Sequence, residues 1–137
     1  MDNEEKLVIF DKFQSAVDAN IVKGALEASG IPAGVLNDST ANAVWMAPVT
    51  VVVFRRDLEE AIKVLYNADM SYEDYQDEMD VFAFENLQAC NRVFSELALK
   101  IHPELAGKET RDLYAQARLA YSGGDLKTLE AILNSLA

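Results

Sequence analysis

Short apolar runs mark the places where the chain is expected to form strands. Residues 7–10 read LVIF, residues 33–38 read AGVLND, and residues 49–54 read VTVVVF. Runs of this length that are rich in branched residues favour strands over helices. The second and third runs are separated only by a short polar stretch, so we expect them to be antiparallel neighbours in one sheet.

Apolar residues at helical spacing occur between the first and second of these runs and again after the third. Ser15 resembles a helix cap and is followed by apolar residues at Ala19, Val22 and Leu26, and Gly30 supplies the left-handed turn that ends a helix. A second helix is predicted over residues 58–65. The resulting order is β-α-β-β-α. Such an order usually places both helices on one face of a small sheet, as in the first five elements of a ferredoxin-like fold.

The second half of the chain has a helical pattern. Its first stripe consists of Leu87, Cys90, Phe94, Leu97 and Ile101. Pro103 ends that helix, and two further helices are predicted around residues 113–121 and 126–136. Residues 79–84 can be interpreted as a fourth strand or as a short helix or ordered connection, and we favour the latter. The predicted class is therefore α+β, with a three-helix region after the sheet.

Charge and composition divide the chain further. The net charge is −11, and residues 69–85 hold seven acidic side chains without one lysine or arginine. We therefore expect three parts: a sheet domain at residues 1–67, an acidic linker or short helix at 68–86, and a helical region at 87–137. The acidic balance opposes binding to phosphate backbones, so nucleic acid is not an expected partner.

The remaining composition points to the cytoplasm. Nothing in the sequence approaches a membrane span, and the N-terminus carries acids where a secretory signal has bases. Cys90 is the single cysteine, so no internal disulfide can form and a reducing compartment is expected. One histidine among scattered acids does not predict a metal site, and no phosphate-binding glycine motif is present, so no cofactor is expected.

The N-terminal order together with GIPAGVLND at residues 30–38 and VTVVVFRRDLEEAIKVL at residues 49–65 resembles the prokaryotic signal-transducing protein domain, a small family related in fold to nitrogen-regulatory PII proteins. The resemblance covers roughly residues 6–67. It implies a PII-like, ferredoxin-like sheet domain with a regulatory role. The matching residues form turns, core and caps, so they indicate fold more than chemistry.

Residues 87–136 resemble a degenerate J-domain, in which a helix leads into a histidine-proline-aspartate loop and a later helix ends near an alanine-tyrosine pair. Here the loop is His102, Pro103 and Glu104, and the pair is Ala120 and Tyr121. In J-domains the loop and the basic helix before it engage a DnaK-type chaperone. This sequence departs from that pattern, because glutamate replaces aspartate and the helix before the loop carries few bases.

These observations select two groups of partner-binding candidates. The first is the J-like loop with the base before it: Lys100, His102, Pro103 and Glu104. The second is the connection between the second and third strands: Asn37, Asp38 and Trp45. Each has a structural alternative, because His102 and Pro103 can simply end a helix and Trp45 can fold back onto the sheet.

The leading hypothesis is a non-enzymatic cytoplasmic regulatory protein that acts through protein binding, with a small-molecule effector and a homodimer left open. The first alternative is a J-domain-like co-chaperone acting through the His-Pro-Glu loop. The second is an enzyme with an unrecognised pocket, which the sequence does not favour because it shows no paired acid and base or nucleophile motif.

Overall fold

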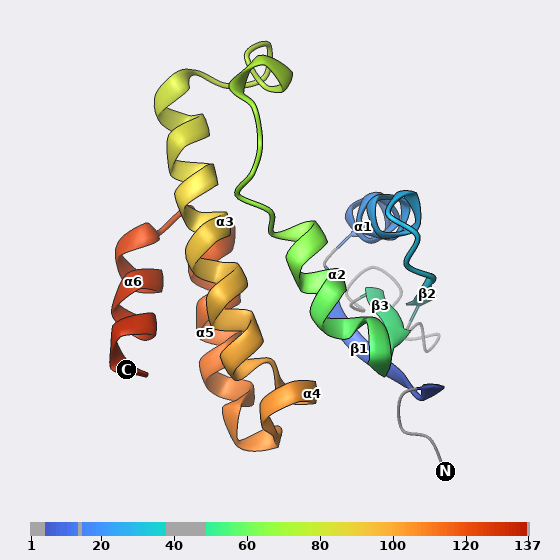
Figure 1. The fold of residues 1–137 in the computed structure, drawn as a ribbon. Helices are drawn as coiled ribbons and strands as arrows, with labels where there is room; N and C mark the ends of the chain where they lie inside the picture. The colour runs from blue at the N-terminus through green and yellow to red at the C-terminus, as the bar shows by residue number, and fades with distance from the viewer. Residues whose placement is uncertain (1–4, 14, 38–48, 137) are drawn as a thin grey trace. The chain divides into compact units, whose positions relative to one another are not determined.

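The computed structural model describes residues 5–13, 15–37 and 49–136. The chain divides into two compact units, Met1–Leu65 and Tyr66–Ala137. The first unit holds an antiparallel sheet with helices, and the second is built from helices (Figure 1). The predicted α+β class is confirmed. Among the described residues, no helix combines the length and apolar character needed to cross a bilayer.

The sheet has three strands, β1 (Leu7–Phe13), β2 (Ala33–Asn37) and β3 (Val49–Phe54). β3 lies in the middle and is antiparallel to both neighbours, which confirms the predicted pairing of the second and third strands. β1 extends three residues past the predicted run at 7–10. The extension continues the pairing with β3 after a register shift between Ile9 and Asp11, where one extra residue is accommodated.

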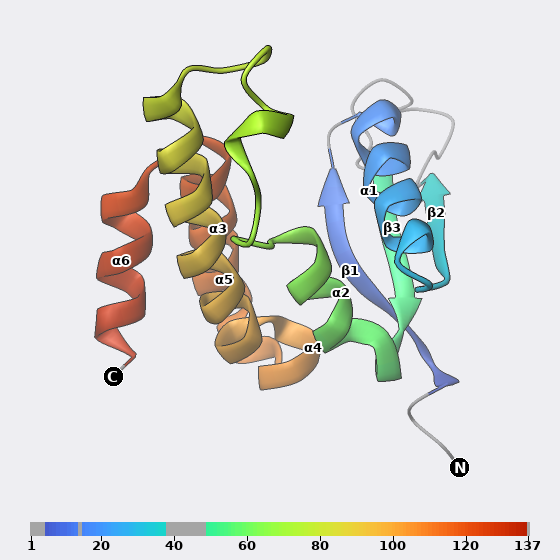
Figure 2. The same ribbon diagram turned by 45° about the horizontal axis from the view of Figure 1, so that its top comes forward.

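Two helices pack on this sheet. α1 (Ala16–Ala28) contacts β2 and β3, α2 (Leu58–Leu65) contacts β1 and β3, and the two helices contact each other. They therefore cover the same face of the sheet, as predicted (Figure 2). The Ser15 hydroxyl caps α1 by accepting the N–H groups of Val17 and Asp18. A 3₁₀ turn over Arg55–Asp57 leads into α2.

Gly30 ends α1 as the sequence indicates. Its φ is +85°, and its N–H donates to the carbonyl of Glu27 while the N–H of Ile31 donates to that of Leu26. These two bonds satisfy carbonyls that the last helical turn leaves free. Leu26 and Ile31 are both buried.

The two faces of the sheet differ in burial. On the face under the helices, Val8, Phe10, Val51 and Val53 are almost fully buried. The aligned register of the strands places a second set of side chains on the opposite face. On that face Leu7 at 56%, Ile9 at 40% and Leu36 at 57% are exposed on the two outer strands, whereas Val52 and Thr50 on the central strand are 6% and 7% exposed.

The second unit contains three longer helices that contact one another, α3 (Val81–Ile101), α5 (Arg111–Ser122) and α6 (Leu126–Ser135) (Figures 1 and 2). The short helix α4 (Pro103–Ala106) and a 3₁₀ turn at Lys108–Thr110 join α3 to α5. The core of this unit consists of Tyr66, Phe84, Cys90, Phe94, Leu97, Ala98, Ile101, Tyr114, Ala117, Ala120, Leu129 and Ile132.

α3 begins at Val81, six residues before the predicted start at residue 87. Asp80 caps it by accepting the N–H of Ala83 at 2.8 Å. Residues 81–84 are therefore helical, and the fourth-strand alternative for 79–84 is wrong. Capping by Asp80 explains the earlier start, because it satisfies a backbone donor of the first turn.

The segment before α3 is attached to that helix rather than extended as a plain connection. Side-chain amides of Gln88 and Asn91 donate to the carbonyls of Ala68 and Asn67 at 2.9 and 3.0 Å. A 3₁₀ turn at Tyr72–Asp74 follows, capped by Ser71. The acidic stretch is thus an ordered part of the second unit over its described length.

Candidate functional site

His102 joins α3 to α4 and caps the shorter helix. Its N–H donates to the carbonyl of Ala98 at 2.9 Å, so it is the last hydrogen-bonded residue of α3. Its ring nitrogen Nδ1 accepts the N–H of Glu104 at 3.1 Å. Pro103 occupies the first position of α4, where a missing N–H costs nothing.

The ring of His102 is buried. The residue is 2% exposed, and the ring lies 4.8 Å from that of Tyr114 between centroids. Because Nδ1 accepts a hydrogen bond, the neutral ring carries its proton on Nε2. A partner could reach this ring only if the end of α3 opened. Of the three loop residues, Pro103 and Glu104 remain half-exposed.

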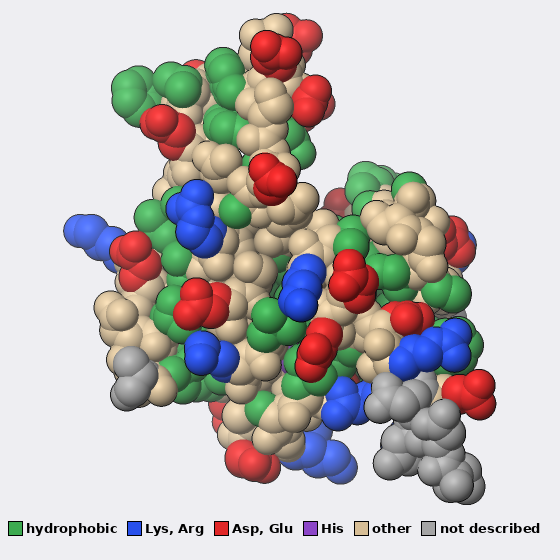
Figure 3. All heavy atoms as spheres, in the orientation of Figure 1, with side chains coloured by type: hydrophobic (Ala, Val, Ile, Leu, Met, Phe, Trp, Pro, Cys, Tyr) green, Lys and Arg blue, Asp and Glu red, His purple; other side chains and the backbone are tan. Residues whose placement is uncertain are grey.

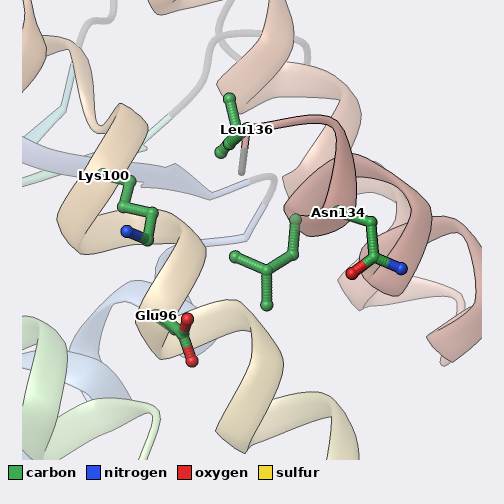
Figure 4. Close-up of a pocket in the computed structure, with 5 residues that line it drawn as sticks. Glu96, Lys100, Asn134 and Leu136 are labelled. Carbon is green, nitrogen blue, oxygen red and sulfur yellow. The ribbon is translucent and has the colours of Figure 1, made fainter.

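Lys100 is exposed on α3. Together with Glu96 it lines one side of a shallow pocket of about 240 Å³ whose other side is formed by Leu133, Asn134 and Leu136 near the end of α6 (Figure 4). The pocket therefore brings together one cation, one anion and an amide around aliphatic carbon. Lys100 is the one J-like candidate that borders it.

The candidates between the second and third strands are only partly described. The backbone of Asn37 pairs with that of Val49 and ends β2. Asp38 and Trp45 lie outside the described residues.

A polar cluster that the sequence did not predict lies inside the second unit. The hydroxyl of Tyr121 donates to the side-chain oxygen of Asn91, whose amide nitrogen donates to the Asn67 carbonyl and contacts the sulfur of Met70 at 3.5 Å. Asn91 is 6% exposed. Burial is the main cause that raises the pKa of Tyr121 to about 12. The phenol is therefore neutral across the physiological range.

Aromatic rings surround this cluster. Tyr66 lies edge-on to Phe94 and Tyr121, with centroid distances of 4.6 and 5.1 Å, and Phe94 lies 5.0 Å from Tyr121. The hydroxyl of Tyr66 accepts a hydrogen bond from Arg118 at 3.3 Å. These contacts make the cluster a specific packing element of the helical unit. No local sequence signal links residues so far apart in the chain.

Cys90 lies on the apolar side of α3, as its place in the predicted stripe indicates. It is 1% exposed. Burial raises the pKa of its thiol, and the negative charges of Asp125 and Glu130 raise it further. A protonated, buried thiol is a poor nucleophile.

Within the part of the chain that the structure describes, no group of three or more histidine, cysteine, aspartate or glutamate side chains is arranged to hold a metal ion. Comparisons with known proteins give no further assignment: no family model, curated protein or solved structure matches the chain.

Proposed function

We propose that this protein is a non-enzymatic cytoplasmic regulator that acts by binding another protein through its sheet unit. The observation that carries the proposal is the face of the sheet opposite α1 and α2. There, Leu7, Ile9 and Leu36 remain between 40% and 57% exposed although they belong to paired strands. Rigid elements that present several aliphatic side chains are typical of protein-binding surfaces.

The geometry of this face favours a flat partner. Ile9, Val52 and Gly34 are directly opposite one another across the three strands. Gly34 has no side chain, and a Cβ added there would lie only 3.3 Å from Val52. Gly34 therefore leaves β2 without a side chain beside Val52, with Ile9 on the other side of Val52 and Leu36 two residues further along β2.

The strand order also supports a PII-like regulator. β1 and β2 run parallel to each other with β3 between them, which is the arrangement of the first three strands of a ferredoxin-like sheet. The resemblance of residues 6–67 to the prokaryotic signal-transducing protein domain agrees with that order. Three other residues have side chains capable of chemistry. His102 and Tyr121 form hydrogen bonds within the chain, and Cys90 is buried.

The test compares capture of cellular proteins by three forms of the full chain. Ile9→Thr/Leu36→Thr makes the open sheet face polar while keeping residues that tolerate strands. Val17→Ser/Ile21→Ser is the matched control, because these α1 side chains are 67% and 64% exposed. We expect a protein that the wild type and the control retain and that the sheet variant loses. If no captured protein distinguishes the sheet variant from the control, the proposal is wrong.

The co-chaperone alternative is less well supported. Its central residue, His102, has Nδ1 occupied by the Glu104 N–H and its ring packed against Tyr114. We therefore expect no stimulation of ATP hydrolysis when the chain is added to a DnaK-type chaperone. Stimulation that His102→Gln abolishes would favour the alternative.

A further inference from the structure

The start of α3 presents an exposed aromatic side chain on a firmly held backbone. Phe82 is 78% exposed, and its neighbour Val81 is 43% exposed. Asp80 caps the helix immediately before them. Phe84, two residues after Phe82, is buried, and its ring centroid lies 5.3 and 5.5 Å from those of Tyr72 and Tyr75 in the preceding segment. The exposed pair is thus anchored on both sides, so a partner pays little ordering entropy to contact it.

The chain segment that holds this pair carries a single sign of charge. Residues 69–85 contain seven acidic side chains and no lysine or arginine, and all seven are exposed. Figure 3 shows hydrophobic and acidic side chains together over the start of α3, at the top of the view, with no basic side chain among them. The acidic residues are Asp69, Glu73, Asp74, Asp77, Glu78, Asp80 and Glu85.

We propose that Val81 and Phe82, with the acidic residues around them, form a docking surface for a basic amphipathic segment of a partner protein. In this complex, apolar side chains of the partner cover Phe82 and Val81. Lysine or arginine side chains flanking them pair with the surrounding carboxylates. This inference rests on the proposed role in protein binding and adds the chemistry of one partner, at a surface separate from the sheet face.

Charge complementarity selects this occupant over the others. A second copy of the chain carries the same charge of −11, and a symmetric contact through this patch would bring two acidic surrounds together. A neutral apolar partner would cover carboxylates without pairing them, which costs free energy. A basic partner avoids both costs, and the field of the acidic end also speeds its association.

The test uses a designed helical peptide with two leucines one turn apart and lysines on either side, added to the full-length chain. Two comparison peptides replace the lysines by glutamate or the leucines by serine. Fluorescence anisotropy of the labelled peptide measures affinity at about 50 and about 200 mM salt, because exposed charge pairs are screened over this range. We expect binding only by the peptide with both lysine and leucine, weaker at the higher salt.

Variants then locate the binding surface. Phe82→Ser is expected to weaken peptide binding about tenfold or more, as loss of an aromatic anchor does. Asp77→Lys/Glu78→Lys should weaken it by reversing local charge. Leu119→Ser is the matched control, since Leu119 is 76% exposed on α5 of the same unit, and it should bind as the wild type does. Unchanged thermal unfolding of each variant shows that the fold is retained.

The inference is overturned if Leu119→Ser weakens binding as much as Phe82→Ser, if the glutamate peptide binds equally well, or if no peptide binds. Capture through the sheet face is measured separately and does not depend on Phe82. If the wild-type chain binds no peptide while the sheet variant still loses a captured protein, this inference alone is refuted. If neither kind of binding is observed, the proposed function is refuted as well.

Discussion

The phenolic hydroxyl of Tyr121 on α5 donates a hydrogen bond to the side-chain oxygen of Asn91 on α3. The same amide donates its N–H to the carbonyl of Asn67, in the segment that precedes α3. One asparagine side chain therefore connects three parts of the helical unit. A buried amide with both ends paired stabilises one arrangement, because losing either partner leaves a desolvated polar atom.

Removing the hydroxyl of Tyr121 should lower the stability of the folded chain. In Tyr121→Phe the ring contacts remain but the oxygen of Asn91 loses its donor, so the free energy of unfolding should fall by about 1 to 3 kcal/mol. Urea denaturation followed by circular dichroism measures this change. Tyr75→Phe is the control, because its ring keeps the packing on Phe84, and it should change stability by less than about 0.5 kcal/mol. Equal effects of the two substitutions would contradict the assigned role.

Alkaline pH should destabilise the fold through the same residue. Burial raises the pKa of Tyr121 to about 12 in the folded chain, above the ordinary value of 10. Between these values the unfolded chain has lost the proton and the folded chain has kept it, so the free energy of unfolding falls as pH rises. Below pH 10 this contribution is fully present. Ultraviolet titration of phenolate should show a group ionising near pH 12 that Tyr121→Phe removes, and its absence from the wild type would refute the prediction.

Two substitutions at His102 separate capping from packing. His102→Ala removes both the acceptor for the Glu104 N–H and the ring against Tyr114, and should cost about 2 to 4 kcal/mol of unfolding free energy. His102→Asn keeps a side-chain acceptor at the cap and should cost less. Thermal and urea unfolding of both variants provide the measurement. If the two variants lose the same stability, the cap contributes nothing.

Two glycines near each other in the chain should respond to alanine with opposite signs. Gly30 has a φ of +85°, so Gly30→Ala should destabilise the chain by about 1 kcal/mol through backbone strain alone. Gly24 lies within α1 with open space where a Cβ would be placed, so Gly24→Ala should stabilise it by about 0.5 to 1 kcal/mol. Urea denaturation of both variants tests this pair, and a shared sign would contradict the described helix end.

The thiol of Cys90 should be inert in the folded chain. It is 1% exposed and its pKa is raised, so a chromogenic aromatic disulfide should react with it only as fast as the chain opens. Reaction should become rapid when urea unfolds the protein. Fast reaction under native conditions would show that the α3 core is accessible.

Local signals in the sequence predicted much of the first unit. Ser15 and Gly30 bound α1 because a side-chain acceptor and a left-handed turn act within a few residues. Branched residues placed β3 correctly. The length of β1 was underestimated because Asp11 and Lys12 interrupt the apolar run, while the register shift beside Ile9 allows pairing to continue.

Contacts between distant residues could not be predicted. Asp80 was an available cap signal for α3, but the apolar residues after it fit a strand and a helix equally well. The pairing of Asn91 with Tyr121 depends on how α3 and α5 pack, which no local pattern encodes. For His102, the following proline indicated a helix end, whereas the burial of its ring against Tyr114 appears only in three dimensions.

The central position of β3 has a consequence for folding during synthesis. Leu7 pairs with Phe54, and β2 has no other strand partner than β3 within the described sheet. Until the ribosome has released β3, the nascent chain holds two strands with nothing between them, and Val8 and Phe10 stay in water. Because such long-range pairing closes slowly, we expect the sheet to assemble in a single late step once its central strand emerges.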